Sequence, residues 1–137
     1  MGTSKVTYLG GLRTEAIHVQ SGNVIITDAP IDNQGKGEAF SPTDLVATAL
    51  GSCMLTLMGI ACNAHQIKGF EGTTIEVTKL MAADPRRIDK VIIEFYLINH
   101  FSDKEKKILE LAAITCPVAK SLHPDLEQEI HFNYPEI

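Results

Sequence analysis

The chain has 137 residues, of which 45% are hydrophobic and 21% are charged, a composition typical of an ordinary globular protein. Its formal net charge of -5 excludes an overall positive field that would attract the phosphate backbone of a nucleic acid. The length favours a single domain over residues 1–137 and disfavours two.

Segments that would direct the chain to a membrane or out of the cell are not evident. Residues 1–6 are not followed by an apolar stretch, so we expect no signal peptide. The longest apolar stretch, 45–64, is interrupted by polar residues and glycine, which favours a buried helix over a membrane span. Three cysteines without an export signal predict a reducing, cytoplasmic compartment, where thiols stay free unless they serve redox or metal chemistry.

The first part of the chain predicts a three-stranded antiparallel meander over residues 6–27. Its β-prone runs are separated by Gly10-Gly11 and by Ser21-Gly22-Asn23, which are typical turn sequences. Residues 28–40 contain a proline, two glycines and neither the helical nor the strand period, so we expect a loop. Long loops of this kind are disproportionately functional.

A long helix is predicted to begin after Ser41. Ser41 suits the N-cap, Pro42 the first helical position and Asp44 the capping carboxylate. The apolar residues that follow cover more than one face, so this helix must be surrounded by protein. It is therefore either the central helix of the domain or one half of a subunit interface.

The second half of the chain predicts two further strands, two helices and a last strand. Antiparallel hairpins with helices grouped between them indicate an α+β fold with sheet and helices in separate layers. A sheet covered on one face needs polar residues or a partner on the other, so we expect a dimer. The predicted elements are strands 73–80 and 91–98, a helix over 102–114 capped by Ser102 and Glu105, a short helix 117–122 and a strand 129–133.

Two cysteines stand in unlike settings. Cys53 lies within the apolar helix, where a thiol is either a small core residue or, beside a cation, a reactive group. Cys116 precedes Pro117, which places its sulfur near the first turn of a helix, where unpaired N–H groups favour a thiolate. The alternative is that Cys116 is a turn residue without a role. We interpret Cys62 as a packing residue. If the fold brings Cys53 and Cys116 together, they form a redox-active pair.

Arg13 is the candidate cation. It interrupts an alternating strand and is either a solvated side chain or, if its strand faces the helix of Cys53, the group that activates this thiol. Glu38, in the predicted loop, could hold the guanidinium in a bidentate pair. Asp44 could do the same, although its capping position already explains it.

Metal and nucleotide chemistry have weak support. Cys62 and His65 lie three residues apart on a helix, whereas a structural zinc site requires four ligands, so we expect no metal. No glycine-rich phosphate loop joins a strand to a helix, and no Ser-His-Asp arrangement can be argued.

The run FSPTDLVATALGSC, from Phe40 to Cys53, and the later run CPVAK, from Cys116, resemble the OsmC/Ohr family of peroxide-reducing proteins, in its OsmC-like branch. That family has a proline-initiated, alanine-rich helix ending in a small residue and cysteine, with a second cysteine followed by proline. The resemblance spans nearly the whole chain, including the 63-residue separation of the two cysteines. It implies an OsmC-like fold, with antiparallel sheets around two long central helices in an intertwined homodimer and active sites at the subunit interface.

The same resemblance implies the roles of the site residues. Cys53 is the peroxidatic thiolate, Cys116 the resolving thiol and Arg13 the strand arginine that stabilises the thiolate. The helix-start glutamate that partners this arginine in typical organic hydroperoxide resistance members is Thr43 here, so we expect Glu38 in its place. The implied activity is reduction of organic hydroperoxides with a small or protein dithiol as reductant, and it requires neither metal nor flavin.

Two other functions stay open. In the first, the cysteines merely pack, and the protein is a stress-induced dimer or binds a hydrophobic small molecule. In the second, it is a thiol-disulfide or regulatory redox protein, which would react with protein disulfides faster than with peroxides. Neither function gives the chain a nucleic-acid or membrane partner.

Overall fold

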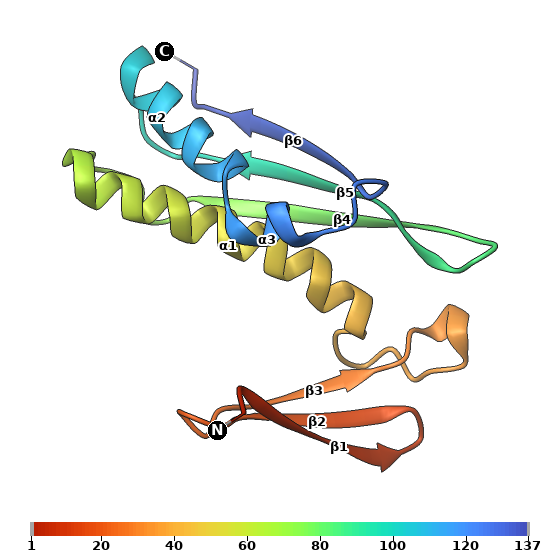
Figure 1. The fold of residues 1–137 in the computed structure, drawn as a ribbon. Helices are drawn as coiled ribbons and strands as arrows, with labels where there is room; N and C mark the ends of the chain where they lie inside the picture. Colours follow the sequence, from red (N-terminus) through yellow and green to blue (C-terminus); the bar gives the residue numbers. More distant parts are fainter. Residues whose placement is uncertain (1, 137) are drawn as a thin grey trace. The chain divides into compact units, whose positions relative to one another are not determined.

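A computed structural model describes residues 2–136, which form two compact units that divide between Val46 and Ala47. Each unit contains one three-stranded sheet (Figure 1). The order of strands and helices is the predicted one, and the α+β class is confirmed. A single domain over residues 1–137 stays a prediction.

The first unit is the predicted antiparallel meander. Gly10 and Gly11 turn the chain at φ values of 86° and 62°, a left-handed conformation that glycine adopts without steric cost. After the third strand the chain runs through the expected loop, which contains one short 3-10 turn, Ile31–Asn33. The strands are β1 (Ser4–Gly10), β2 (Arg13–His18) and β3 (Val24–Asp28).

The long helix α1 (Pro42–His65) begins where the capping pattern predicted. The backbone N–H of Ser41 donates to Asp44 Oδ2 at 3.0 Å, and the backbone N–H of Asp44 donates to Ser41 Oγ at 3.0 Å, so two of the first N–H groups are satisfied. Its length and composition would also allow it to cross a membrane. One face is buried, at the spacing of three and four residues expected for a helix lying on a core: Ala47, Leu50, Gly51, Met54, Met58 and Cys62.

The second sheet corrects one prediction, because it is mixed and not antiparallel. Strand β4 (Thr74–Ala82) pairs antiparallel with β5 (Arg87–Tyr96), but β6 (Glu127–Asn133) pairs parallel with β5. The cause is the long crossover after β5, which carries two helices and returns the chain to the same end of the sheet. These helices are α2 (Asp103–Ile114) and α3 (Pro117–Ser121).

One face of the second sheet carries the core. Val91, Ile93 and Phe95 alternate along β5 and are fully buried, in one cluster with residues of α1 and α2. Helix α1 comes especially close at Gly51, where an added Cβ would lie 2.4 Å from Ile75 Cδ1. The predicted capping box of Ser102 and Glu105 begins α2. The helices therefore form a layer on this face, as Figure 1 shows.

Candidate functional site

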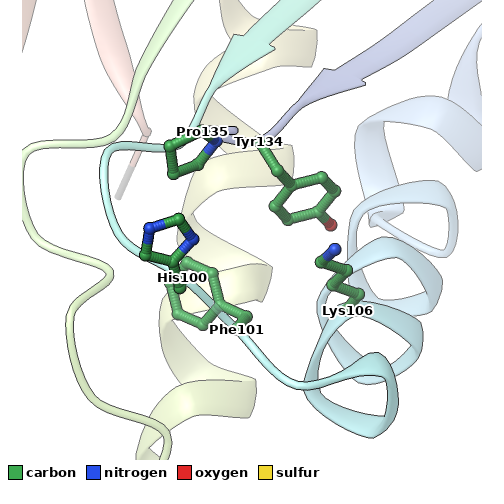
Figure 2. Close-up of a pocket in the computed structure, with 5 residues that line it drawn as sticks. All are labelled: His100, Phe101, Lys106, Tyr134 and Pro135. Carbon is green, nitrogen blue, oxygen red and sulfur yellow. The ribbon is translucent and has the colours of Figure 1, made fainter. Parts of the chain in front are cut away.

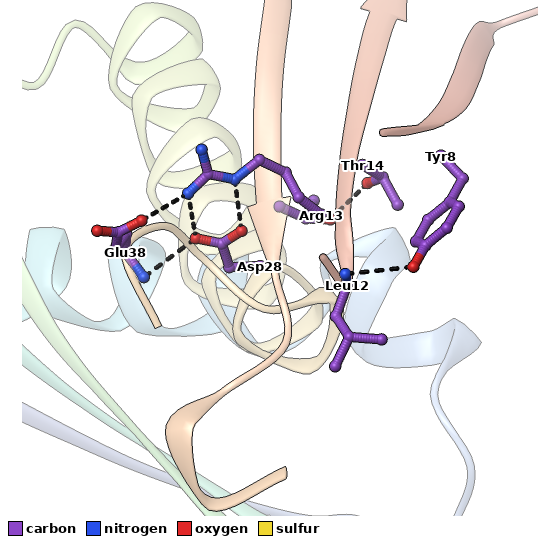
Figure 3. A network of polar contacts seen from close by, with 7 residues as sticks. Tyr8, Leu12, Arg13, Thr14, Asp28 and Glu38 are labelled. Carbon is purple, nitrogen blue, oxygen red and sulfur yellow. Dashed lines mark hydrogen bonds and ion pairs between the residues drawn. The ribbon is translucent and has the colours of Figure 1, made fainter. Parts of the chain in front are cut away.

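The first unit places Arg13 between two carboxylates (Figure 3). Arg13 begins β2 and is the register partner of Asp28, the last residue of β3. Its Nε donates to Asp28 Oδ1 at 2.7 Å and its Nη2 to Asp28 Oδ2 at 2.8 Å, a bidentate pair. Nη2 also donates to Glu38 Oε1 at 2.8 Å. Two strands and the loop after them therefore hold one guanidinium.

The two carboxylates differ in burial. The side chain of Asp28 is 1% exposed, whereas that of Glu38 is 65% exposed. Asp28 Oδ2 also accepts the backbone N–H of Glu38 at 3.1 Å, which ties the loop to the pair. The hydrogen bonds from Arg13 hold the pKa of Asp28 below its usual range despite burial, and Asp28 in turn raises the pKa of Arg13. Asp28 is thus a fixed, ionised anchor, and Glu38 is an outer partner.

These contacts refine the sequence-based view of the arginine. Glu38 does contact Arg13, but through one oxygen, and the bidentate partner is Asp28, which the sequence analysis did not select. Asp44 caps α1 through its bond with the Ser41 N–H. The predicted turn at 21–23 would pair residue 13 with residue 31, whereas the observed register is centred between residues 20 and 21 and pairs residue 13 with residue 28, so the sequence contained no signal for Asp28.

The second unit brings Cys53 and Cys116 together. Cys53 is half-buried in α1, and Cys116 is fully buried as the N-cap of α3, where its Sγ accepts the backbone N–H of Ala119 at 3.4 Å. The two thiols are hydrogen-bonding neighbours, and both are free. The juxtaposition on which a redox-active pair depends is therefore present within a single chain.

The electrostatics of Cys116 are set mainly by burial. Desolvation raises the pKa of its thiol, and the Cys53 side chain raises it further. The backbone N–H groups of Ala119 and Val118 lower it, which is the effect that the sequence predicted for this position. Burial outweighs these groups, so Cys116 is a neutral thiol near pH 7 and not the thiolate that its place before Pro117 favoured.

Cys62, the third cysteine, is also free. It is buried in the core of the second unit, as the packing interpretation expected. Desolvation first, and then the charges of Glu71 and Glu105, raise the pKa of its thiol. Among residues 2–136, no group of three or more His, Cys, Asp or Glu side chains is arranged to hold a metal ion.

A shallow hollow of about 500 Å³ lies in the first unit beside the outer carboxylate of the arginine network. Its apolar wall includes Phe40, which is 54% exposed. Such a hollow can receive an organic group next to Glu38. Its lining consists of Gly37, Glu38, Ala39, Phe40 and Asp44.

The comparisons agree on one family. Residues 35–131 match the family described as OsmC-like protein. A Psychrobacter arcticus crystal structure, provisionally named an osmotic stress induced and detoxification response protein, is 60% identical, with 97% of this chain and 96% of that chain covered and a TM-score of 0.93. An organic hydroperoxide resistance protein OsmC from Legionella pneumophila shares the fold at 15% identity, with 97% and 98% covered and a TM-score of 0.75. An organic hydroperoxide resistance protein from Elizabethkingia anophelis shares the fold at 14% sequence identity, with 98% of each chain covered and a TM-score of 0.75. No curated protein matches the chain.

Proposed function

Because this chain belongs to the OsmC-like protein family, we propose that it is a thiol-dependent peroxidase that reduces organic hydroperoxides through Cys53 and Cys116. The observation that carries the proposal is the contact between the two thiols, one half-buried in α1 and the other buried at the start of α3. The names of the Legionella and Elizabethkingia proteins, which share the fold, point to the same class of substrate.

In the proposed reaction, the Cys53 thiolate attacks the distal oxygen of the hydroperoxide. An S–O bond forms and the O–O bond breaks, so that Cys53 becomes a sulfenic acid. The departing alkoxide takes a proton from water and leaves as an alcohol. The Cys116 sulfur then attacks the Cys53 sulfur, so that an S–S bond forms and the hydroxyl leaves as water with the Cys116 proton. A dithiol reductant restores both thiols by exchange and is itself oxidised to a disulfide.

The different settings of the two cysteines suit different roles. A peroxidatic sulfur must meet a substrate, and Cys53 is the more accessible of the two. A resolving sulfur should not compete for peroxide, and the raised pKa of Cys116 keeps it in the less reactive thiol form until a sulfenic acid is beside it.

We assign to Arg13 the cation that stabilises the Cys53 thiolate and the negative charge on the departing oxygen. Its bonds to Asp28 and Glu38 use Nε and Nη2, and Figure 3 shows Nη1 directed away from both carboxylates. Nη1 is therefore the nitrogen suited to the reacting oxygen. Asp28 acts as a positioning residue, because its two bonds fix the plane of the guanidinium.

We also propose that the functional form is a cytoplasmic homodimer in which α1 packs against a second copy. The side chain of Ile60 on α1 is 56% exposed, and on the first sheet Tyr8 and Val24 are 64% and 51% exposed. Apolar residues left uncovered on a long helix and on a sheet favour association. Light scattering of the purified protein tests this state, with an expected shift toward monomer on Ile60→Glu and no shift on Asn63→Glu, which changes an exposed polar residue of the same helix.

Steady-state consumption of tert-butyl hydroperoxide with dithiothreitol tests the activity. Cys53→Ser should abolish turnover, and Cys116→Ser, treated with peroxide in the absence of dithiothreitol, should consume one equivalent and then stop at the sulfenic acid. Cys62→Ser is the matched control and should retain activity. Mass spectrometry of peroxide-treated wild type should show a link between residues 53 and 116.

Equal rates in the wild type and Cys53→Ser would refute the peroxidase. Faster oxidation by a protein disulfide than by the peroxide would instead favour the thiol-disulfide alternative. If neither oxidant produces a disulfide between the two cysteines, the non-enzymatic role is the function that remains.

A further inference from the structure

A second recess lies in the unit formed by residues 47–136, between the first turns of α2 and the segment that follows β6 (Figure 2). Its volume is about 200 Å³. The residues that line it come from the end of the β5–α2 connection, from α2 itself and from the last described part of the chain: His100, Phe101, Lys106, Tyr134 and Pro135.

Its walls are aromatic and held in place. Phe101 is buried, and its ring meets that of Tyr134 edge to face, with centroids 6.4 Å apart and planes at 70°. The Tyr134 hydroxyl donates to Glu110 Oε2 at 2.7 Å, which fixes the far end of the tyrosine ring against α2. Burial and this carboxylate raise the pKa of Tyr134, so the phenol stays neutral. The recess is therefore preformed and can accept a flat apolar group.

The charged side chain in its lining is a cation, Lys106. Lys106 Nζ lies 4.6 Å from the centroid of the Tyr134 ring, a contact with an uncharged partner that leaves the positive charge available to an anion. His100 is exposed at the rim. Two acidic groups of the same helix have partners, since Glu110 accepts from Tyr134 and Glu105 accepts the backbone N–H of Ser102 at 3.0 Å, and the third, Asp103, does not line the recess.

We propose that this recess binds a small aromatic carboxylate, whose ring lies against Phe101 and Tyr134 and whose carboxylate pairs with Lys106. The size agrees, because a cavity of about 150 Å³ is enough to hold benzene. The recess lies beside the first turns of α2, whereas Cys116 follows its last turn. At about 1.5 Å per residue, the eight helical steps from Lys106 to the end of α2 at Ile114 already separate the two regions by roughly 12 Å. The site is thus distinct from the thiol pair and independent of the proposed peroxidase.

Titration of the full chain with benzoate, followed by amide NMR, tests the proposal. Saturable shifts are expected at His100, Phe101, Lys106 and Tyr134. Benzamide, which keeps the ring but lacks the charge, should bind roughly tenfold more weakly. Lys106→Met should weaken benzoate binding by a similar factor, whereas Lys107→Met, which removes the same charge from an exposed position of α2, should leave the affinity unchanged.

Three outcomes would overturn the proposal. The first is the absence of saturable shifts at these residues with wild type at millimolar benzoate. The second is equal weakening by the two lysine substitutions, which would indicate only a general attraction of anions to α2. The third is equal affinity for benzoate and benzamide. Thermal unfolding of Lys106→Met establishes that the variant is folded, and Lys106→Arg, which keeps the charge, should retain binding if the proposal holds.

Discussion

The two glycines in the body of α1 predict substitutions of opposite sign. Gly51 faces the second sheet, and an added Cβ would lie 2.4 Å from Ile75 Cδ1 and 3.2 Å from Val77 Cγ2. At Gly59, an added Cβ would meet no atom of the described residues within 4 Å. Gly51→Ala therefore forces a repacking that Gly59→Ala does not require.

The magnitudes follow from two competing effects. Alanine stabilises a helix interior by about 0.8 to 1 kcal/mol relative to glycine, and this gain applies to both sites. Ordinary carbon contacts need about 3.5 Å or more, so at Gly51 the Ile75 methyl must move by roughly 1 Å. Overpacking of this kind costs about 1 to 3 kcal/mol; the end of Ile75 is flexible, but Val77 Cγ2 is crowded as well, so we take a cost of about 2 kcal/mol. We expect Gly51→Ala to destabilise the protein by about 1 kcal/mol and Gly59→Ala to stabilise it by a similar amount.

Urea unfolding of the two variants and the wild type, at one fixed protein concentration, measures the difference. The expected gap between the variants is about 2 kcal/mol. A Gly51→Ala protein at least as stable as Gly59→Ala would refute the close approach of α1 to β4. Gly51→Ser adds the same Cβ and should also destabilise.

Three further predictions concern titratable groups. The pKa of Asp28 is lowered in the folded protein, so its pair with Arg13 adds stability that is present above about pH 4 and lost as pH falls below it. Asp28→Asn should therefore reduce the loss of unfolding free energy, measured with urea, as pH falls through this range. The pKa of Cys116 is raised, so a carbon-13 NMR titration of its Cβ should show the thiol losing its proton only at alkaline pH, and a thiolate at neutral pH would contradict the assignment. The pKa of His131 is raised mainly by Glu129, so their pair adds stability that is present below about pH 6.5 and lost at higher pH. In an NMR titration, the Glu129→Gln variant should show a lower pKa for His131 than the wild type.

Local patterns predicted the elements well, because the residues that determine them are close in sequence. Both capping boxes, at Ser41 and at Ser102, are read from residues three positions apart. The turns at Gly10-Gly11 and at residues 21–23 likewise depend on local backbone preferences, and the meander follows from them.

Pairings between distant residues were harder to predict. The parallel pairing of β6 depends on which side the chain returns after α3, and no local pattern of residues 127–133 records this. Asp28 escaped selection because it ends a strand and resembles an ordinary turn aspartate until the hairpin register places it opposite Arg13. The net rise in the pKa of Cys116 depends on burial by the whole unit, which outweighs the helix start visible in the sequence.

The position of Cys116 as the cap of α3 links the chemistry of its sulfur to the backbone that follows. The same Sγ that accepts the Ala119 N–H would become part of the disulfide in the proposed cycle. Electron density withdrawn from that sulfur on oxidation weakens it as an acceptor, so the amide of residue 119 serves as a built-in reporter of the redox state. If the proposed cycle operates, its proton resonance and exchange with deuterium would distinguish the thiol form of the pair from the disulfide without any external label.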